Sequence, residues 1–329
     1  MKPDLSRTYH VARILRRIVL VGTLSAVLAA CGVPDLVVRT PKEEVAKLPL
    51  IDVHSHSSGN PRRTVQEFIE SMDATGIERM VLFMGGSFTG GGNRASELQK
   101  YPERFVLFYT GPIANDTARA KIKSGDPNIL EVLLADYERA LKSGLYRGPG
   151  EIHTYHSDRP TQIAPDSPAI RGLLELVTRY DLPINIHCTA DGRAEIERVL
   201  KAYPKATVIW AHTGTFLPPA ALMDLLHTHP NLYFDLAIKN KRLRRDAYPI
   251  LFGTTLREEW RQLFESYPDR FFVGFDFPGV GEFHGTRLET ARKSTEFIRA
   301  ILTQLTPDTA RKIAYENARG MLAKGKTKR

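Results

Sequence analysis

Ile51-Asp52-Val53-His54-Ser55-His56 is the stretch on which the interpretation of this chain depends. A mostly apolar run from residue 48 to residue 53 leads into two histidines with one residue between them. Successive side chains of a strand point to opposite faces, so His54 and His56 are expected to point the same way. Two imidazoles at a strand end make half of a metal site, although an isolated pair of this kind is more often an ordinary surface or core pair.

Four further strand-like runs carry residues that could complete such a site. Three of them end at His187, His212 and Asp276, and the run 146–152 carries Glu151. Eight strand-like segments alternate with helix-like ones along the chain, which predicts an α/β fold of the (β/α)8 TIM barrel type. In such barrels the catalytic groups lie at the C-terminal ends of the strands. The candidate ligands all fall at those ends, and this coincidence favours a metal site over a chance pair.

Residues 1–30 have the pattern of an export signal, because three arginines precede an uncharged apolar stretch that is short for a membrane span. The small residues before Cys31 resemble the bacterial lipobox, in which the leader is cut before a cysteine that then carries lipid. This resemblance predicts a lipoprotein signal peptide, lipidation of Cys31, and a membrane-anchored protein of the cell envelope that faces the periplasm. A plain signal peptide, a retained anchor helix, or a twin-arginine signal at Arg16-Arg17 are the alternatives.

Residues 31–48, with prolines and a charged patch, are expected to form a tether, 49–325 the barrel, and 326–329 a basic tail. The net charge of +9 lies mostly in the leader and the tail, so the body is close to neutral. A nucleic-acid-binding protein usually carries a basic face on its folded part, so no nucleic acid partner is expected.

Cysteine usage excludes a disulfide framework. The chain has two cysteines, and if Cys31 carries lipid then only Cys188 remains to pair. Cys188 follows His187 and should face away from it, so we expect a buried structural thiol.

Several motifs together resemble the amidohydrolase superfamily and, within it, the amidohydrolase-related (amidohydrolase 2) family. They run from the first strand to the last helix and cover nearly all of the barrel. The matching stretches are Asp52-Val53-His54-Ser55-His56, Tyr101-Pro102-Glu103-Arg104-Phe105, Ile186-His187, Ala211-His212-Thr213-Gly214, Pro230-Asn231-Leu232-Tyr233-Phe234-Asp235, Gly274-Phe275-Asp276-Phe277-Pro278 and Glu316-Asn317-Ala318-Arg319-Gly320-Met321-Leu322.

The resemblance implies a barrel of the metal-dependent hydrolase type with one or two divalent ions. It implies that His54 and His56 bind the first ion, that His187 and His212 bind a second ion or contact substrate, and that Asp276 is a metal ligand and the general base. Many members carry a carboxylated lysine that bridges two ions where this chain has Glu151, which can bridge directly or contribute nothing. Imidazole and carboxylate ligands suit zinc best, with manganese or iron as alternatives.

The leading functional hypothesis is a metal-dependent hydrolase of a small carbonyl compound: an amide, lactone or ester. Asp276 would take the proton from the attacking water, and His212 or His187 would stabilise the oxyanion. A non-oxidative decarboxylase of an aromatic or unsaturated acid is the alternative in the same fold. A catalytically silent, lipid-anchored binding protein is the rival class.

Substrate contacts are harder to predict from the sequence. His153 shares the face of Glu151 if the strand continues, so it is a candidate for contact with metal or substrate; otherwise it is a loop histidine. Arg242 and Arg244 belong to a basic run after the seventh strand, which either clamps an anionic substrate or is a solvated face. His156 is expected on a loop at the same rim, where nothing in the sequence selects it.

Overall fold

The computed structural model describes residues 38–57, 64–85, 92–156, 161–215, 217–237, 249–277 and 287–324. The chain divides into two units, Met1–Val38 and Arg39–Arg329, and the second holds every strand within those ranges. Cys31, Arg242 and Arg244 lie outside the described residues, as do the leader and the basic tail, so the expectations for them stay predictions. No helix in the described ranges is long and apolar enough to cross a membrane.

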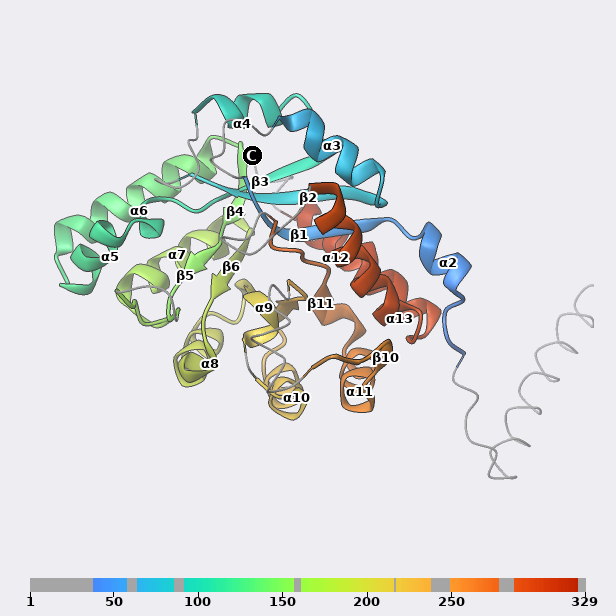
Figure 1. Cartoon of the computed structure of the whole chain (residues 1–329). Helices are drawn as coiled ribbons and strands as arrows, with labels where there is room; N and C mark the ends of the chain where they lie inside the picture. The colour runs from blue at the N-terminus through green and yellow to red at the C-terminus, as the bar shows by residue number, and fades with distance from the viewer. Residues whose placement is uncertain are drawn as a thin grey trace, which may run out of the picture. The chain divides into compact units, whose positions relative to one another are not determined.

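Parallel strands form two sheets, with helices lying around them (Figure 1). The strand order is β1-β2-β3-β4 in one sheet and β11-β8-β7-β6-β5 in the other. Their bounds are β1 Leu50–His56, β2 Ile77–Met84, β3 Phe105–Tyr109, β4 Tyr146–Pro149, β5 Ile152–His153, β6 Pro183–His187, β7 Thr207–Trp210, β8 Leu232–Asp235 and β11 Phe271–Phe272. The pieces β4 and β5 together correspond to the strand predicted at 146–152, so the two parallel sheets supply the eight strands of a barrel. The predicted α/β fold of the (β/α)8 type is confirmed.

Backbone hydrogen bonds join the first strand to the segment that follows the last. Val53 N donates to Val273 O at 2.9 Å, and Phe275 N donates to His54 O at 3.2 Å. The order of the strands along the chain is therefore also their order around the barrel. This arrangement brings the C-terminal ends of the strands to one rim, where the candidate ligands are expected.

The helices alternate with the strands and bury the apolar faces that their spacing predicts. In α7, for example, Ile170, Leu173, Leu174 and Val177 are all buried. The bounds are α3 Val65–Asp73, α4 Gly92–Leu98, α5 Asp116–Lys123, α6 Pro127–Lys142, α7 Pro168–Tyr180, α8 Arg193–Ala202, α10 Pro219–Thr228, α11 Glu258–Ser266, α12 Arg287–Leu302, α13 Pro307–Arg311 and α14 Asn317–Ala323. A π-helical turn at Lys312–Glu316 joins α13 to α14, and a short hairpin of β9 Leu251–Phe252 and β10 Thr255–Leu256 precedes α11.

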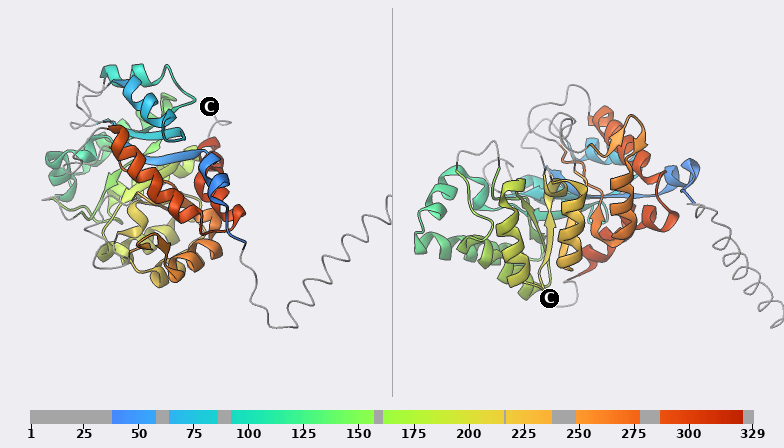
Figure 2. Two further views of the ribbon diagram at one scale, coloured as in Figure 1. Left: turned by 45° about the vertical axis from the view of Figure 1, so that its right-hand side comes forward. Right: turned by 90° about the horizontal axis from the view of Figure 1, so that it is seen from below.

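Part of the expected tether is folded. Residues Lys42–Lys47 form α2, whose Val45 is buried, and Thr40 Oγ1 donates a hydrogen bond of 2.8 Å to Leu305 O. Helix α12 packs against both α2 and α3 (Figure 2). A single apolar anchor among charged residues is a weak sequence signal, which is why this short helix was not predicted.

Apolar side chains form two clusters. The larger lies between the strands and the helices, and the smaller joins strand residues such as Ile51, Val53 and Phe83 to α14. The ring of His54 contacts that of Phe83 at 4.7 Å between centroids, so His54 lies on the side of the smaller cluster. A register shift in the pairing of β1 with β2, between Asp52 and Ser55, lets Val53 and His54 share this side despite being adjacent.

Strands β4 and β6 pack closely at Gly148, so a substitution there tests the packing of the barrel. A Cβ on Gly148 would lie 2.2 Å from the backbone oxygen of Pro183 and 3.0 Å from Phe108 Cε2. We expect Gly148→Ala to lower the free energy of unfolding by about 1–3 kcal/mol or more, because a backbone atom cannot move aside as a side chain can. Gly320→Ala is the matched control, since a Cβ on this exposed position of α14 meets nothing within 4 Å. Urea unfolding should show a lower midpoint for the first variant and an equal or higher one for the second; equal midpoints for both would contradict the packing.

Candidate metal centre

Glu151 lies in the break between β4 and β5, and its two carboxylate oxygens face different histidines. Oε2 lies 3.3 Å from His56 Nε2 and 3.7 Å from His54 Nε2. Oε1 lies 2.7 Å from His187 Nδ1 and 3.1 Å from His212 Nε2. One buried carboxylate thus joins the two histidines of β1 to the histidines at the ends of β6 and β7.

Asp276 completes the group on the Oε2 side. Its Oδ1 lies 3.1 Å from His56 Nε2 and 3.8 Å from His54 Nε2, and its side chain is fully buried. Ligands held about 2.0–2.2 Å from one zinc ion in a tetrahedron lie about 3.3–3.6 Å from one another. His54, His56, Glu151 and Asp276 therefore surround a space of the right size for one ion.

Three successive backbone amides of the Asp276 loop are held by residues of β1. Phe275 N donates to Asp52 Oδ1 at 3.1 Å, Asp276 N donates to His54 O at 2.6 Å, and Phe277 N donates to Ser55 Oγ at 3.1 Å. Ser55 Oγ in turn donates to Asp52 Oδ2 at 2.5 Å. Burial raises the pKa of Asp52 to about 7, against the lowering effect of the Ser55 hydroxyl. This network fixes Asp276 relative to the histidine pair of the same strand.

Asp235, at the end of β8, orients two of the histidines. Its Oδ2 lies 2.9 Å from His54 Nδ1 and accepts from Asn185 Nδ2 at 2.9 Å, while its Oδ1 accepts from His212 N at 2.8 Å. A carboxylate behind an imidazole fixes its tautomer and strengthens it as a ligand. Sequence analysis missed this role, although Asp235 ends the seventh predicted strand just as Asp276 ends the eighth.

The hydrogen-bond pattern at His54 fits a bound cation. Nδ1 faces Asp235, so in a neutral ring the proton belongs on Nδ1 and the lone pair on Nε2. Nε2 is buried, has no hydrogen-bond partner among the described residues, and faces the carboxylates of Glu151 and Asp276. A lone pair that faces two carboxylates is electrostatically unfavourable, so this position attracts either a proton, as the raised pKa of His54 shows, or a metal ion that takes the proton's place.

His212 repeats this pattern on the other side of Glu151. Its Nδ1 lies 2.6 Å from Ala237 O, which can only accept, so Nδ1 carries the proton and Nε2 is left to face Glu151 Oε1. His212 has a left-handed backbone, with φ +56, and so has Asp276, with φ +55. Residues other than glycine rarely adopt this conformation, and such strain is concentrated at functional sites. The strands predicted to end at these two residues end earlier in the structure, at Trp210 and Phe272.

The carboxylates at the site attract positive charge. Burial alone would lower the pKa of His54, but the carboxylates of Asp235 and Glu151 outweigh it and raise the pKa well above its usual range. Burial lowers the pKa of His187 to about 4, against the raising effect of Glu151, so its imidazole is neutral near pH 7. Burial alone would raise the pKa of Glu151, but the neighbouring His153 and His54 outweigh it and hold the pKa well below its usual range. A neutral imidazole and an ionised carboxylate are the forms that bind metals.

The structure brings the six predicted ligands together: the four histidines face Glu151, and Asp276 faces two of them. His153 joins them, with Nε2 at 2.9 Å from Glu151 Oε2. Cys188 is buried and not in a disulfide, and burial raises the pKa of its thiol to about 12, as expected of a structural thiol.

Solved structures similar to this chain are α/β barrels of the same kind. An uncharacterised TIM-barrel protein from Bordetella bronchiseptica is 17% identical, with a TM-score of 0.60 over 84% of this chain and 99% of that one. A probable 2-pyrone-4,6-dicarboxylic acid hydrolase from Acinetobacter baumannii, solved with citric acid, is 16% identical, with a TM-score of 0.56 over 84% and 99%. An amidohydrolase from Burkholderia multivorans with bound zinc is 13% identical, with a TM-score of 0.51 over 84% and 99%.

At these identities the solved structures establish the fold alone. Comparison with curated proteins found no match. The family model described as amidohydrolase, by contrast, matches residues 64–323, which is most of the chain and spans four of the six predicted ligands. The chain therefore belongs to the amidohydrolase family.

Proposed function

We propose that the protein is a metal-dependent hydrolase of a small carbonyl compound, an amide, lactone or ester. The observation that supports the proposal most is that the two carboxylate oxygens of Glu151 face different groups of candidate ligands. The group on the Oε2 side includes Asp276. His54, His56 and Asp276 would hold one ion on the Oε2 side, and His187 and His212 a second on the Oε1 side. A divalent ion held by these residues, zinc by preference, would lower the pKa of a bound water to about 7 and polarise a carbonyl oxygen.

The residues of the chain have separate tasks in this reaction. Asp276 accepts a proton from the attacking water and delivers it to the leaving group, since it is a carboxylate fixed at three successive amides. Asp235 keeps His54 in one tautomer. His212 has its Nδ1 proton committed to Ala237 O, so it serves as a ligand through Nε2 rather than as a donor to an oxyanion.

Metal removal is the first test. Purified full-length protein treated with a chelator should lose turnover in a panel of lactones, amides and esters, and zinc should restore it. The reason is that neutral imidazoles and carboxylates cannot activate water to this extent without the ion. The same panel should contain aryl and unsaturated acids, followed by CO₂ release. Turnover of the acids with CO₂ release and no water added would contradict hydrolysis, and full activity after verified metal removal would contradict the metal centre.

A further inference from the structure

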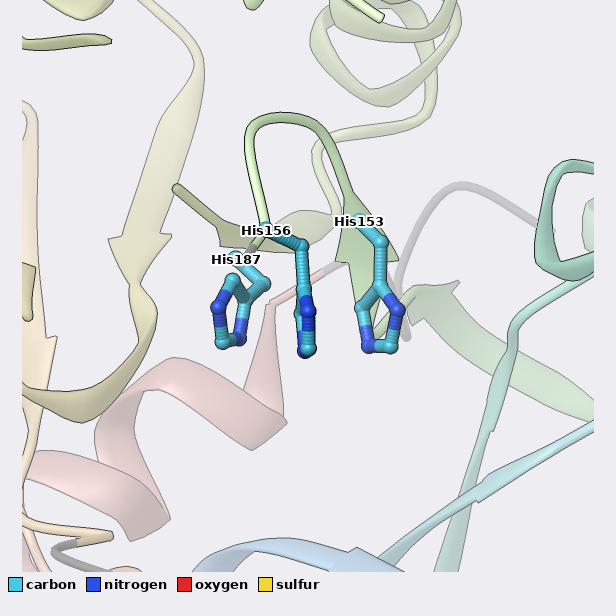
Figure 3. Close-up of side chains that lie close together, drawn as sticks. All are labelled: His153, His156 and His187. Carbon is cyan, nitrogen blue, oxygen red and sulfur yellow. The ribbon is translucent and has the colours of Figure 1, made fainter. Parts of the chain in front are cut away.

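His153, His156 and His187 form a second group of imidazoles beside the Glu151 centre (Figure 3). Each offers a ring nitrogen within 4.8 Å of those of the other two. Their ring centroids make a nearly regular triangle, with sides of 4.3 Å for His156–His187, 4.8 Å for His153–His156 and 5.2 Å for His153–His187. The three rings project side by side in the same direction, as the figure shows.

The triangle has the size of a three-histidine metal site. Zinc binds imidazole nitrogen at about 2.0–2.1 Å, which places the centres of three rings on one tetrahedral ion about 5 Å apart. The interplanar angles are 29° for His153–His156, which are stacked, 31° for His156–His187 and 59° for His153–His187, so each ring is turned relative to the next. Imidazole ligands suit zinc, copper or nickel.

Two polar side chains hold the segment that carries His153 and His156, while His187 ends β6. Arg119 is fully buried, and its guanidinium donates to His153 O at 2.6 Å, Thr154 O at 3.0 Å and Thr161 O at 2.8 Å. Burying a guanidinium is costly unless it is hydrogen-bonded. The buried Arg119 donates to backbone carbonyls and does not pair with a carboxylate of the Glu151 centre.

Gln162 holds His156 itself at two points. Its Oε1 accepts from His156 N at 2.7 Å, and its Nε2 donates to His156 O at 2.6 Å. The backbone of His156 is thus fixed, although this residue lies beyond the end of β5 and belongs to none of the ligand groups that include Glu151. A loop held this firmly around two histidines is expected where their side chains must keep a set geometry.

We propose that His153, His156 and His187 form an additional binding site for a divalent transition-metal ion, next to the Glu151 centre and sharing His187 with it. The site goes beyond the proposed hydrolase, which does not use His156. His187 belongs to both groups, so it would bind the two ions through its two ring nitrogens as a bridging imidazolate, after loss of its N–H proton. His153 also contacts Glu151. His156 is therefore the position that reports on this site alone.

The test is a zinc count. Full-length protein is stripped of metal, loaded with Zn²⁺ alone, freed of excess by dialysis and assayed for zinc per chain. We expect His156→Ala and His156→Gln to hold one equivalent less than the wild type. His227→Ala, which removes an exposed histidine on α10, should leave the count unchanged. Anomalous diffraction from zinc-loaded crystals should show an ion among the three rings in the wild type and none there in His156→Ala.

The outcomes separate this site from the proposed function. Zinc that stays bound in both His156 variants reports on the Glu151 centre. Variants that bind no zinc at all would therefore show failure of that centre, whatever the outcome for the additional site. A circular dichroism spectrum equal to that of the wild type in at least one variant shows that the fold is kept. Equal zinc content in the wild type and both variants, or crystals without anomalous density among the three rings, would overturn the additional site.

Discussion

Asp276→Asn should lower turnover by about 10²–10⁴-fold while most of the metal stays bound. Asparagine has nearly the same size and keeps an oxygen toward His56, but its amide cannot accept the proton of the attacking water. His54, His56 and Glu151 remain in place to hold the ion, so metal content should change much less than turnover. The measurements are kcat on whichever substrate the panel identifies and zinc per chain on the same preparation.

The left-handed backbone of Asp276 calls for a control that separates conformation from chemistry. Asp181 ends α7 with φ +53, close to the φ of Asp276, and lies exposed and away from the candidate ligands. Asparagine tolerates this conformation about as well as aspartate. Asp181→Asn should therefore leave turnover and stability unchanged. Turnover of Asp276→Asn at the wild-type rate would contradict the assignment of Asp276 as the base.

Strand ends were the part of the site that could be predicted from the sequence. His54, His56, His187 and Asp276 each follow an apolar run of strand length, and the parallel barrel carries all such ends to one rim. Glu151 lies at this rim for the same reason, even though its strand is broken into two pieces. Local periodicity is sufficient here because the barrel topology converts a position along each strand into a position in space.

Contacts between distant segments could not be predicted in this way. Asp235 meets His54 across 181 positions of sequence, and Asp52 meets Phe275 across 223. Arg119 reads as one more charge on an exposed helix until the fold shows it buried against the loop of His153. Such residues orient the ligands without being ligands, so their spacing follows no motif.

The backbone conformation at the site could not be predicted from the sequence either. The left-handed turns at His212 and Asp276, and the register shift that brings His54 to the side of Phe83, depend on tertiary hydrogen bonds rather than on residue propensity. Periodicity predicted that His54 and His56 share a face, but it could not say which face of β1 that would be.

The largest change in metal content is expected from Glu151→Gln. Glutamine keeps the length of the side chain but offers one oxygen and one N–H₂ group, so it cannot present a lone pair and negative charge to both ligand groups. His187 Nδ1 and His212 Nε2 face one carboxylate oxygen, and His54 and His56 face the other. We expect the variant to bind one ion fewer and to lose most of its turnover, because the pair on the Oε1 side keeps only two protein ligands.

The count must not be confused with the neighbouring three-histidine group, so both proteins in this comparison carry His156→Ala. In that background zinc per chain should fall from about two to about one on changing Glu151, the number expected if one carboxylate bridges a pair of ions. Glu131→Gln, on the exposed face of α6, is the matched control and should change neither count nor turnover. Equal unfolding midpoints would show that the loss is local. Full activity with one ion, unchanged in Glu151→Gln, would contradict the bridging role of Glu151. The centre would then be mononuclear, held by His54, His56 and Asp276. In that case the alternative function, a non-oxidative decarboxylase, would be the better explanation.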